Sequence, residues 1–273
     1  MDPFSAAILG LVQALTEFLP VSSSGHLVLA HRVLDVTNQT GIAADAFAVA
    51  VHFGTLLSVC IVFWPDILAL LRSVCRTIRK PFAIPGQWRD DADFRLTAAI
   101  VLGCIPAGVV GLLFKDQLEA AFHDATLVCW ALICTGFVLL ATRFARVGEG
   151  SVGLGHACLI GLAQAVAIIP GVSRSGSTIA MAMFLRIERE QAAKYSFLLS
   201  LPVIAGASGL KAMDLSTQSL PQGTWLSLGL GALVAFVVGI GALKMLMVVV
   251  KRGAFSHFGW YCIALGGIGL FYV

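Results

Sequence analysis

The sequence is poor in charged residues: aspartate, glutamate, lysine and arginine together make up 12% of its 273 residues. A soluble domain carries about 25% charged residues. The start, MDPFSAAILG, also lacks the basic residues and the small-residue cleavage site of a secretory signal peptide, and Asp2 and Pro3 instead suit the beginning of a helix. Because 58% of the residues are hydrophobic, these absences exclude a soluble protein and predict an integral membrane protein.

Long apolar stretches separated by short polar breaks predict membrane-spanning α-helices rather than the strands of a β-barrel. Six stretches are long enough to cross a bilayer, at residues 44–64, 94–114, 125–142, 192–210, 225–249 and 254–273. The polar segment 65–92 is expected to be a connection. Two other apolar stretches, 4–19 and 152–170, stop at a proline and a Ser/Gly turn. Short helices are expected after these turns, at residues 26–34 and 177–186. Each pair predicts a re-entrant hairpin, shielded by protein or lining a wet cavity.

The two hairpin sequences are copies of one another. GLVQALTEFLPVSSSGH (10–26) and GLAQAVAIIPGVSRSGS (161–177) are identical at 8 of 17 positions without a gap. Each half of the chain consists of one hairpin and three spans. Because three is an odd number, the second half must have the opposite orientation in the membrane. The predicted fold is therefore an all-α, inverted-topology repeat in one membrane domain, with a first repeat at 1–146 and a second at 147–273.

The distribution of lysine and arginine predicts the orientation in the membrane. Thirteen of these residues fall on the face that carries residues 65–92, namely Arg72, Arg76, Arg79, Lys80, Arg89, Arg95, Arg143, Arg146, Arg186, Arg189, Lys194, Lys251 and Arg252. Three fall on the other face, namely Arg32, Lys115 and Lys211. The positive-inside rule places the richer face in the cytoplasm and both termini outside. The first hairpin then enters from outside and the second from inside, so their turns are expected to meet near the middle of the membrane.

Few ionisable groups are expected at membrane depth: Glu17, His26, His52 and Arg174. A charge there costs about 2.5–3.5 kcal/mol on insertion scales, so such groups are functional by default. Two structural alternatives remain open. Glu17 and Arg174 can form an ion pair that only joins the hairpins, and His52 is equally well explained by packing.

Both turns have the composition of an anion site, because serine and glycine at the beginning of a helix leave backbone N–H groups and the positive end of the helix dipole free. The second turn adds an arginine, which binds phosphate through a planar fork. Simple N-capping explains either turn alone, but two turns at equivalent places in the repeat favour a phosphate or pyrophosphate site. Its predicted binding residues are Ser22, Ser24, Gly25, Ser173, Arg174, Ser175 and Gly176.

The first hairpin also carries candidate catalytic groups. Gln13 and Glu17 lie four residues apart on one helix face, where they offer oxygen ligands to a divalent cation, Mg²⁺ or Ca²⁺. Glu17 can instead accept a proton from a hydroxyl. Ser23 is the candidate nucleophile and His26 the candidate general acid or base. Attack by His26 or directly by water remains an alternative.

Two long motifs, LTEFLPVSSSGH (15–26) and PGVSRSGST (170–178), closely resemble the signature motifs of the undecaprenyl-pyrophosphate phosphatases of the bacitracin-resistance type. FGTLLSV (53–59) and IPAGVVGLLF (105–114) fit the same family, so the resemblance covers nearly the whole chain. It implies a bacterial inner-membrane enzyme, with its active site towards the periplasm. Such an enzyme removes the terminal phosphate of undecaprenyl pyrophosphate and returns the monophosphate carrier to peptidoglycan synthesis.

By motif position, the resemblance implies that Glu17, Ser23 and His26 are catalytic and that Arg174 grips phosphate. The family's earlier acidic position is Gln13 here, which its Glu/Gln consensus permits, but a scheme with two carboxylates on one metal is then incomplete. The phosphatidic-acid-phosphatase type is excluded, because the chain has no Arg-Pro dipeptide and carries Ala180 where that type has a histidine.

The rival class is a polyprenyl-phosphate flippase or another transporter, since inverted repeats with broken helices are typical of transporters. Glu17 and His26 have no counterparts in the second repeat, which favours catalysis. The expected partners are the polyprenyl pyrophosphate and membrane lipid, without nucleic acid. A homodimer is an option because glycine-rich faces let spans pack closely, at Gly229, Gly231, Gly239 and Gly241.

Overall fold

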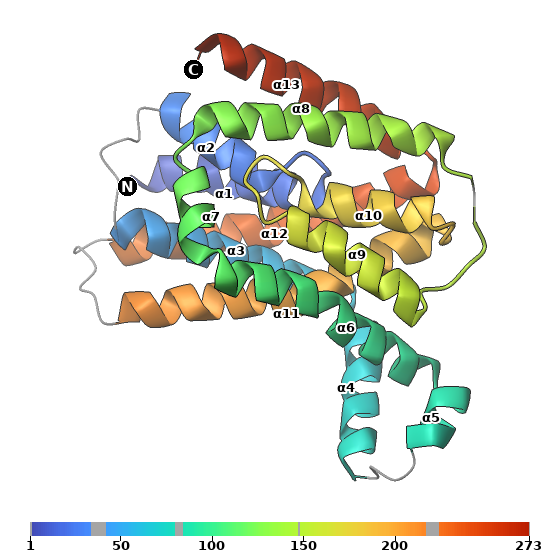
Figure 1. Ribbon diagram of the computed structural model, residues 1–273. Helices are drawn as coiled ribbons and strands as arrows, with labels where there is room; N and C mark the ends of the chain where they lie inside the picture. Colours follow the sequence, from blue (N-terminus) through green and yellow to red (C-terminus); the bar gives the residue numbers. More distant parts are fainter. Residues whose placement is uncertain (1, 34–41, 80–83, 147, 217–223, 273) are drawn as a thin grey trace.

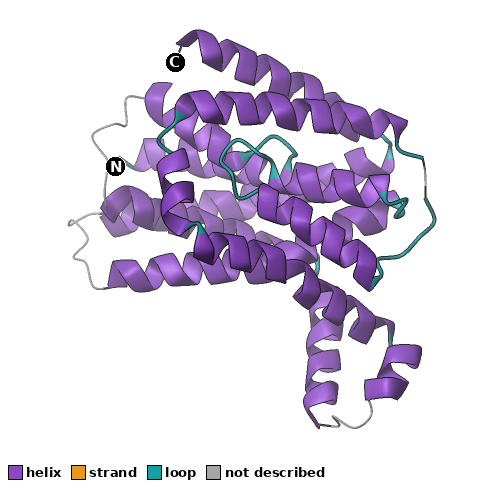
Figure 2. Cartoon of the chain, in the orientation of Figure 1, coloured by secondary structure: helices purple, strands orange, loops and turns teal. Residues whose placement is uncertain are grey.

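The computed structural model describes residues 2–33, 42–79, 84–146, 148–216 and 224–272. Within these ranges the chain is helical, with no strand beyond one isolated bridge between Gly150 and Ile187 (Figure 2). The α-helices are α1 Pro3–Phe18, α2 Ser23–Val33, α3 Ile42–Val62, α4 Trp64–Arg79, α5 Ile84–Asp90, α6 Ala92–Leu113, α7 Lys115–Ala121, α8 Ala125–Ala141, α9 Leu154–Val166, α10 Arg174–Phe184, α11 Arg189–Ser216, α12 Thr224–Lys251 and α13 Phe258–Tyr272. Lys80 and residue 147 lie outside the described residues, and the side chain of Arg32 is not described either.

Five helices are long and apolar enough to cross a membrane, so the prediction of a multi-pass, all-α membrane protein is confirmed. They are α3, α6, α8, α11 and α12. The sixth predicted span, 254–273, differs because its first residues form a 3₁₀ turn at Phe255–His257. The helix that remains, α13, has 15 residues, about 22 Å at 1.5 Å per residue. Gly253, with φ of 77°, makes the turn between α12 and this 3₁₀ segment.

The sequence predicted that the polar segment 65–92 is a simple connection. In the structure this segment instead forms most of α4 and all of α5. Apolar residues recur at helical spacing in α4, and Ile67 and Leu70 pack against the main core. Figure 1 shows α4 and α5 projecting from one end of the helix bundle, with the two chain termini at the other end. The basic segment and the termini therefore lie at opposite ends of the molecule.

The first helices of the two hairpins pack in equivalent ways against the opposite half of the chain. A Cβ atom built on Gly10 of α1 would lie 2.5 Å from the carbonyl oxygen of Gly231 on α12. One built on Gly161 of α9 would lie 2.6 Å from the carbonyl oxygen of Gly103 on α6. Only glycine permits these backbone contacts, and Gly10 and Gly161 are equivalent positions of the sequence repeat.

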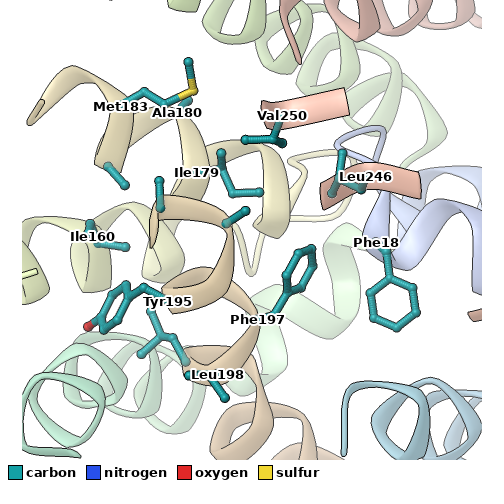
Figure 3. Packing of buried hydrophobic residues seen from close by; sticks show 14 of the residues in the cluster. Phe18, Ile160, Ile179, Ala180, Met183, Tyr195, Phe197, Leu198, Leu246 and Val250 are labelled. Carbon is teal, nitrogen blue, oxygen red and sulfur yellow. The ribbon is translucent and has the colours of Figure 1, made fainter. Parts of the chain in front are cut away.

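The main hydrophobic core surrounds α10 and α11 and supports both hairpin tips. Phe197 of α11 packs edge-on against Phe18, the last residue of α1, with ring centroids 5.8 Å apart. Figure 3 shows Ile179 and Met183 of α10 in the same cluster, with Tyr195 of α11 at its edge. The end of α1 and the beginning of α10 are thereby held against one rigid surface.

Candidate active site

The tips of the two hairpins touch. The backbone N–H of Gly171 donates to Ser24 Oγ at 3.4 Å, and the hydroxyl of Ser175 donates to the carbonyl oxygen of Leu19 at 3.2 Å. Figure 1 shows α1 and α2 coming from the end with the termini, and α9 and α10 from the opposite end. Residues about 150 positions apart in sequence therefore meet inside the bundle.

Local chemistry explains the shape of the first tip. Ser22 has a φ of 69°, a left-handed conformation that turns the chain after Pro20. Its hydroxyl accepts the backbone N–H of Gly25 at 3.3 Å. This capping bond starts α2 at Ser23, three residues before the predicted beginning, so the Ser/Gly motif forms the first helical turn.

The second tip is held by α8. Gly171 has a φ of 91°, and a Cβ there would lie 2.4 Å from the carbonyl oxygen of Val128. Thr135 of α8 donates to the Gly171 carbonyl at 3.2 Å and accepts the Ser173 N–H at 3.3 Å. Ser173 then caps α10 by accepting the Gly176 N–H at 3.0 Å, so α10 begins at Arg174 rather than at the expected residue 177.

Glu17 is the centre of the site. Its Oε2 accepts the Ser23 hydroxyl at 2.7 Å and the Gln13 amide at 3.0 Å, and its Oε1 accepts the Arg174 guanidinium. The Glu17 side chain is 6% exposed. A buried carboxylate is stable only when paired and hydrogen-bonded, and these three donors meet that condition. The structure therefore brings three of the predicted catalytic residues, Glu17, Ser23 and Arg174, into one cluster.

Two buried polar atoms in this cluster have no hydrogen-bond partner: Arg174 Nη1 and Gln13 Oε1. Leaving a buried polar group unpaired costs about 1–3 kcal/mol. Arg174 Nη1 is a charged donor and Gln13 Oε1 is an acceptor. An anion and a cation or hydrogen-bond donor are the ligands that would satisfy them.

The other predicted phosphate-binding residues mainly shape the turns. Ser22 and Ser24 share a hydrogen bond at 3.2 Å, and Ser173 and Ser175 share one at 3.3 Å. The N–H groups of Gly25 and Gly176 are used in capping. The first two residues of α2 and of α10 have backbone N–H groups without an acceptor in the preceding helical turn. These N–H groups remain available to an anion.

His26 has hydrogen-bond partners other than Glu17. Its Nδ1 lies 2.8 Å from the Ser22 carbonyl oxygen and its Nε2 lies 2.7 Å from the hydroxyl of Tyr261 on α13. The two rings are almost parallel, with centroids 5.6 Å apart. No sequence pattern indicated Tyr261, because it lies 235 positions from His26 on a helix without a motif.

His52 of α3 also reaches the cluster, with its Nε2 3.8 Å from Glu17 Oε2. Its Nδ1 lies 2.7 Å from the carbonyl oxygen of Ala48, which fixes the ring within its own helix. A separation of 3.8 Å is too long for a hydrogen bond, so His52 and Glu17 form an ion pair only when the imidazole is protonated.

An apolar cavity of about 670 Å³ lies beside His26 and Tyr261. Its walls come from α1, α2, the end of α12 and α13, and include Leu15, Leu19, Val249 and Phe258. A polar cluster and an apolar groove therefore adjoin at the first hairpin turn.

These features define a polytopic membrane protein with a charged site enclosed by its helices. The family model described as "Bacitracin resistance protein BacA" matches residues 6–268, and the chain belongs to that family. A relative from Salinibacter ruber, named undecaprenyl-diphosphatase, is 41% identical over 271 residues, covering 99% of both chains. A relative of the same name from Desulfosudis oleivorans is 43% identical over 275 residues, covering 99% of this chain and 98% of its own. The resemblance seen in the motifs is thus confirmed at the level of the family.

Proposed function

We propose that the protein is an undecaprenyl-diphosphate phosphatase, which hydrolyses undecaprenyl pyrophosphate to undecaprenyl phosphate and phosphate. It recycles the lipid carrier of cell-wall synthesis and confers resistance to bacitracin. The observation that carries the proposal is the Glu17 carboxylate, which accepts both the Ser23 hydroxyl and the Arg174 guanidinium. The relatives named undecaprenyl-diphosphatase, which align over almost the full chain, support the choice of substrate.

In the proposed reaction the terminal phosphate binds Arg174 and the free N–H groups at the two helix beginnings. Ser23 Oγ attacks this phosphorus while Glu17 accepts the hydroxyl proton, for which the 2.7 Å hydrogen bond supplies the path. The bridging P–O bond breaks and undecaprenyl phosphate leaves. Water then hydrolyses the phosphoserine and releases phosphate.

A divalent cation, Mg²⁺ or Ca²⁺, is part of the proposal. Gln13 and Glu17 would hold it, and the unpaired, buried Gln13 Oε1 fits an oxygen ligand of such an ion. Among the described residues no three His, Cys, Asp or Glu side chains gather at one point, so substrate oxygens would complete the coordination. When bound, the cation neutralises charge on the pyrophosphate.

The membrane arrangement is also proposed: two inverted repeats, each with a re-entrant hairpin, in a bacterial inner membrane. The matched contacts of Gly10 with Gly231 and of Gly161 with Gly103 support the repeat. With α4 and α5 in the cytoplasm, both termini lie outside and the site opens towards the periplasm. A homodimer would use Gly229 and Gly241, whose added Cβ atoms would meet nothing within 4 Å. Gly231 and Gly239, which were expected on the same face, pack inside the protein instead, because a Cβ there would lie 2.4 Å from Phe47 and 2.5 Å from Ser58, respectively.

A transporter or flippase is the second candidate, because the two hairpins enter from opposite ends of the bundle, as in many transporters. Purified protein in detergent separates the two classes, since no vectorial transport is possible there. We expect the wild type to release phosphate from farnesyl pyrophosphate and Ser23→Ala to lose this activity. An inactive wild type would favour transport, and a fully active Ser23→Ala would exclude the serine mechanism.

A further inference from the structure

The hydrogen bonds of His26 define which of its nitrogens carries a proton. The carbonyl oxygen of Ser22, 2.8 Å from Nδ1, can only accept, so Nδ1 is protonated. In the neutral ring, Nε2 then carries a lone pair. The hydroxyl of Tyr261, 2.7 Å away, donates its proton to this lone pair. The basic atom of His26 is therefore hydrogen-bonded to Tyr261, whereas Ser23 is hydrogen-bonded to Glu17.

The same two side chains also line the apolar cavity beside the first hairpin. On α1, Leu15 and Leu19 line this cavity, whereas Gln13 and Glu17 belong to the charged cluster. At 100° per residue these pairs point roughly 160° apart around the helix. A diphosphate at the hairpin turn would contact Ser23 with one end and direct its polyprenyl chain into the cavity with the other.

Phosphoryl transfer requires the attacking and leaving oxygens to lie in line on opposite sides of phosphorus. In the proposed first step the lipid monophosphate departs on the side opposite Ser23, which is the side of the cavity. Water must attack the phosphoserine from that same side in the second step. His26 and Tyr261 thus face the water and not the serine.

We propose that Tyr261 is a catalytic residue of the second step, in which it relays a proton from the attacking water to His26. This inference rests on the proposed function and deepens it. The bond between the water oxygen and phosphorus forms, and the bond between Ser23 Oγ and phosphorus breaks. One water proton moves to the Tyr261 oxygen as the Tyr261 proton moves to His26 Nε2. Ser23 Oγ keeps the electron pair and takes back the proton held by Glu17, and His26 later returns its proton through Tyr261 to the phosphate.

The test is Tyr261→Phe in the full-length protein in detergent, with farnesyl pyrophosphate as substrate. The phenylalanine keeps the ring against His26 and removes only the hydroxyl. We expect kcat to fall on the order of 10²-fold, the lower end for general acid–base catalysis. Because the first step does not use the relay, farnesyl monophosphate should appear in a burst without matching inorganic phosphate. Mass spectrometry of acid-quenched protein should detect phosphate on Ser23.

Tyr272→Phe is the matched control, because Tyr272 lies on the same helix and is 85% exposed. It should behave as the wild type. Thermal unfolding of both variants shows whether they fold equally well. A Tyr261→Phe enzyme with wild-type kcat, or one that is slow without a burst or phosphoserine, would overturn the relay. Wild-type phosphate release in the same preparation tests the proposed function separately, so the two failures are distinguishable.

Discussion

Glu17 and Arg174 form an ion pair that joins α1 to α10 across 157 positions of sequence. Their side chains are 6% and 16% exposed, so the pair is largely removed from water. Removing one partner of a buried pair costs about 3–5 kcal/mol, because the other charge is left uncompensated. The pair is therefore one of the contacts between the hairpins and also the source of the charge that the proposed chemistry needs.

Arg174→Ala is expected to lower phosphate release from farnesyl pyrophosphate by about 10²–10³-fold, as for other preorganised donors to a developing charge. Arg174→Lys should recover only part of this loss, since lysine keeps the charge but not the planar fork. Arg72→Ala, at an exposed arginine on the projecting α4, is the control and should keep the wild-type rate. An Arg174→Ala protein that is folded and fully active would contradict the assignment.

His52→Gln tests the longer approach to Glu17. His52 lies 3.8 Å from Glu17 with its side chain 33% exposed, so when protonated it forms a partly solvated ion pair. Such pairs contribute about 0.2–1 kcal/mol, so the rate of phosphate release is expected to fall by no more than about fivefold. A loss as large as that of Arg174→Ala would show that His52 has a direct chemical role.

The proposed site for a divalent cation can be tested at Gln13. Chelation by EDTA is expected to lower phosphate release by the wild type, and added Mg²⁺ or Ca²⁺ to restore it. Gln13→Glu puts a second carboxylate where an amide now lies 3.0 Å from Glu17, so the two side chains should repel without a cation and chelate one when it is present. The variant should need less cation for half-maximal activity. An unchanged requirement would remove Gln13 from the proposed cation site.

Sequence patterns predicted the contacts that follow from strong chemistry. Glu17 and Arg174 were expected together because charges at membrane depth need partners, and the repeat identified both turns. The patterns did not predict the contacts that depend on how the helices pack together. Tyr261 and Thr135 reach the tips through helices that carry no motif. The 3₁₀ turn at Phe255–His257 also depends on how the chain leaves α12, which hydropathy does not encode.

The inverted repeat can be tested through its glycines. Gly10→Ala and Gly161→Ala each add a Cβ within 2.6 Å of a carbonyl oxygen, so both should destabilise the protein through overpacking. Overpacking costs about 1–3 kcal/mol, more than the roughly 1 kcal/mol that alanine gains over glycine in a helix. Gly108→Ala on α6 meets nothing within 4 Å and should be neutral or stabilising.

Thermal unfolding of the three glycine variants in one detergent measures these effects. If the two halves are structural copies, the midpoints of Gly10→Ala and Gly161→Ala should fall by similar amounts, while that of Gly108→Ala should not fall. Unequal shifts, with only one of the two contacts sensitive, would mean that the halves share a sequence motif without sharing its packing. The two hairpins would then not be equivalent elements related by a pseudo-two-fold axis.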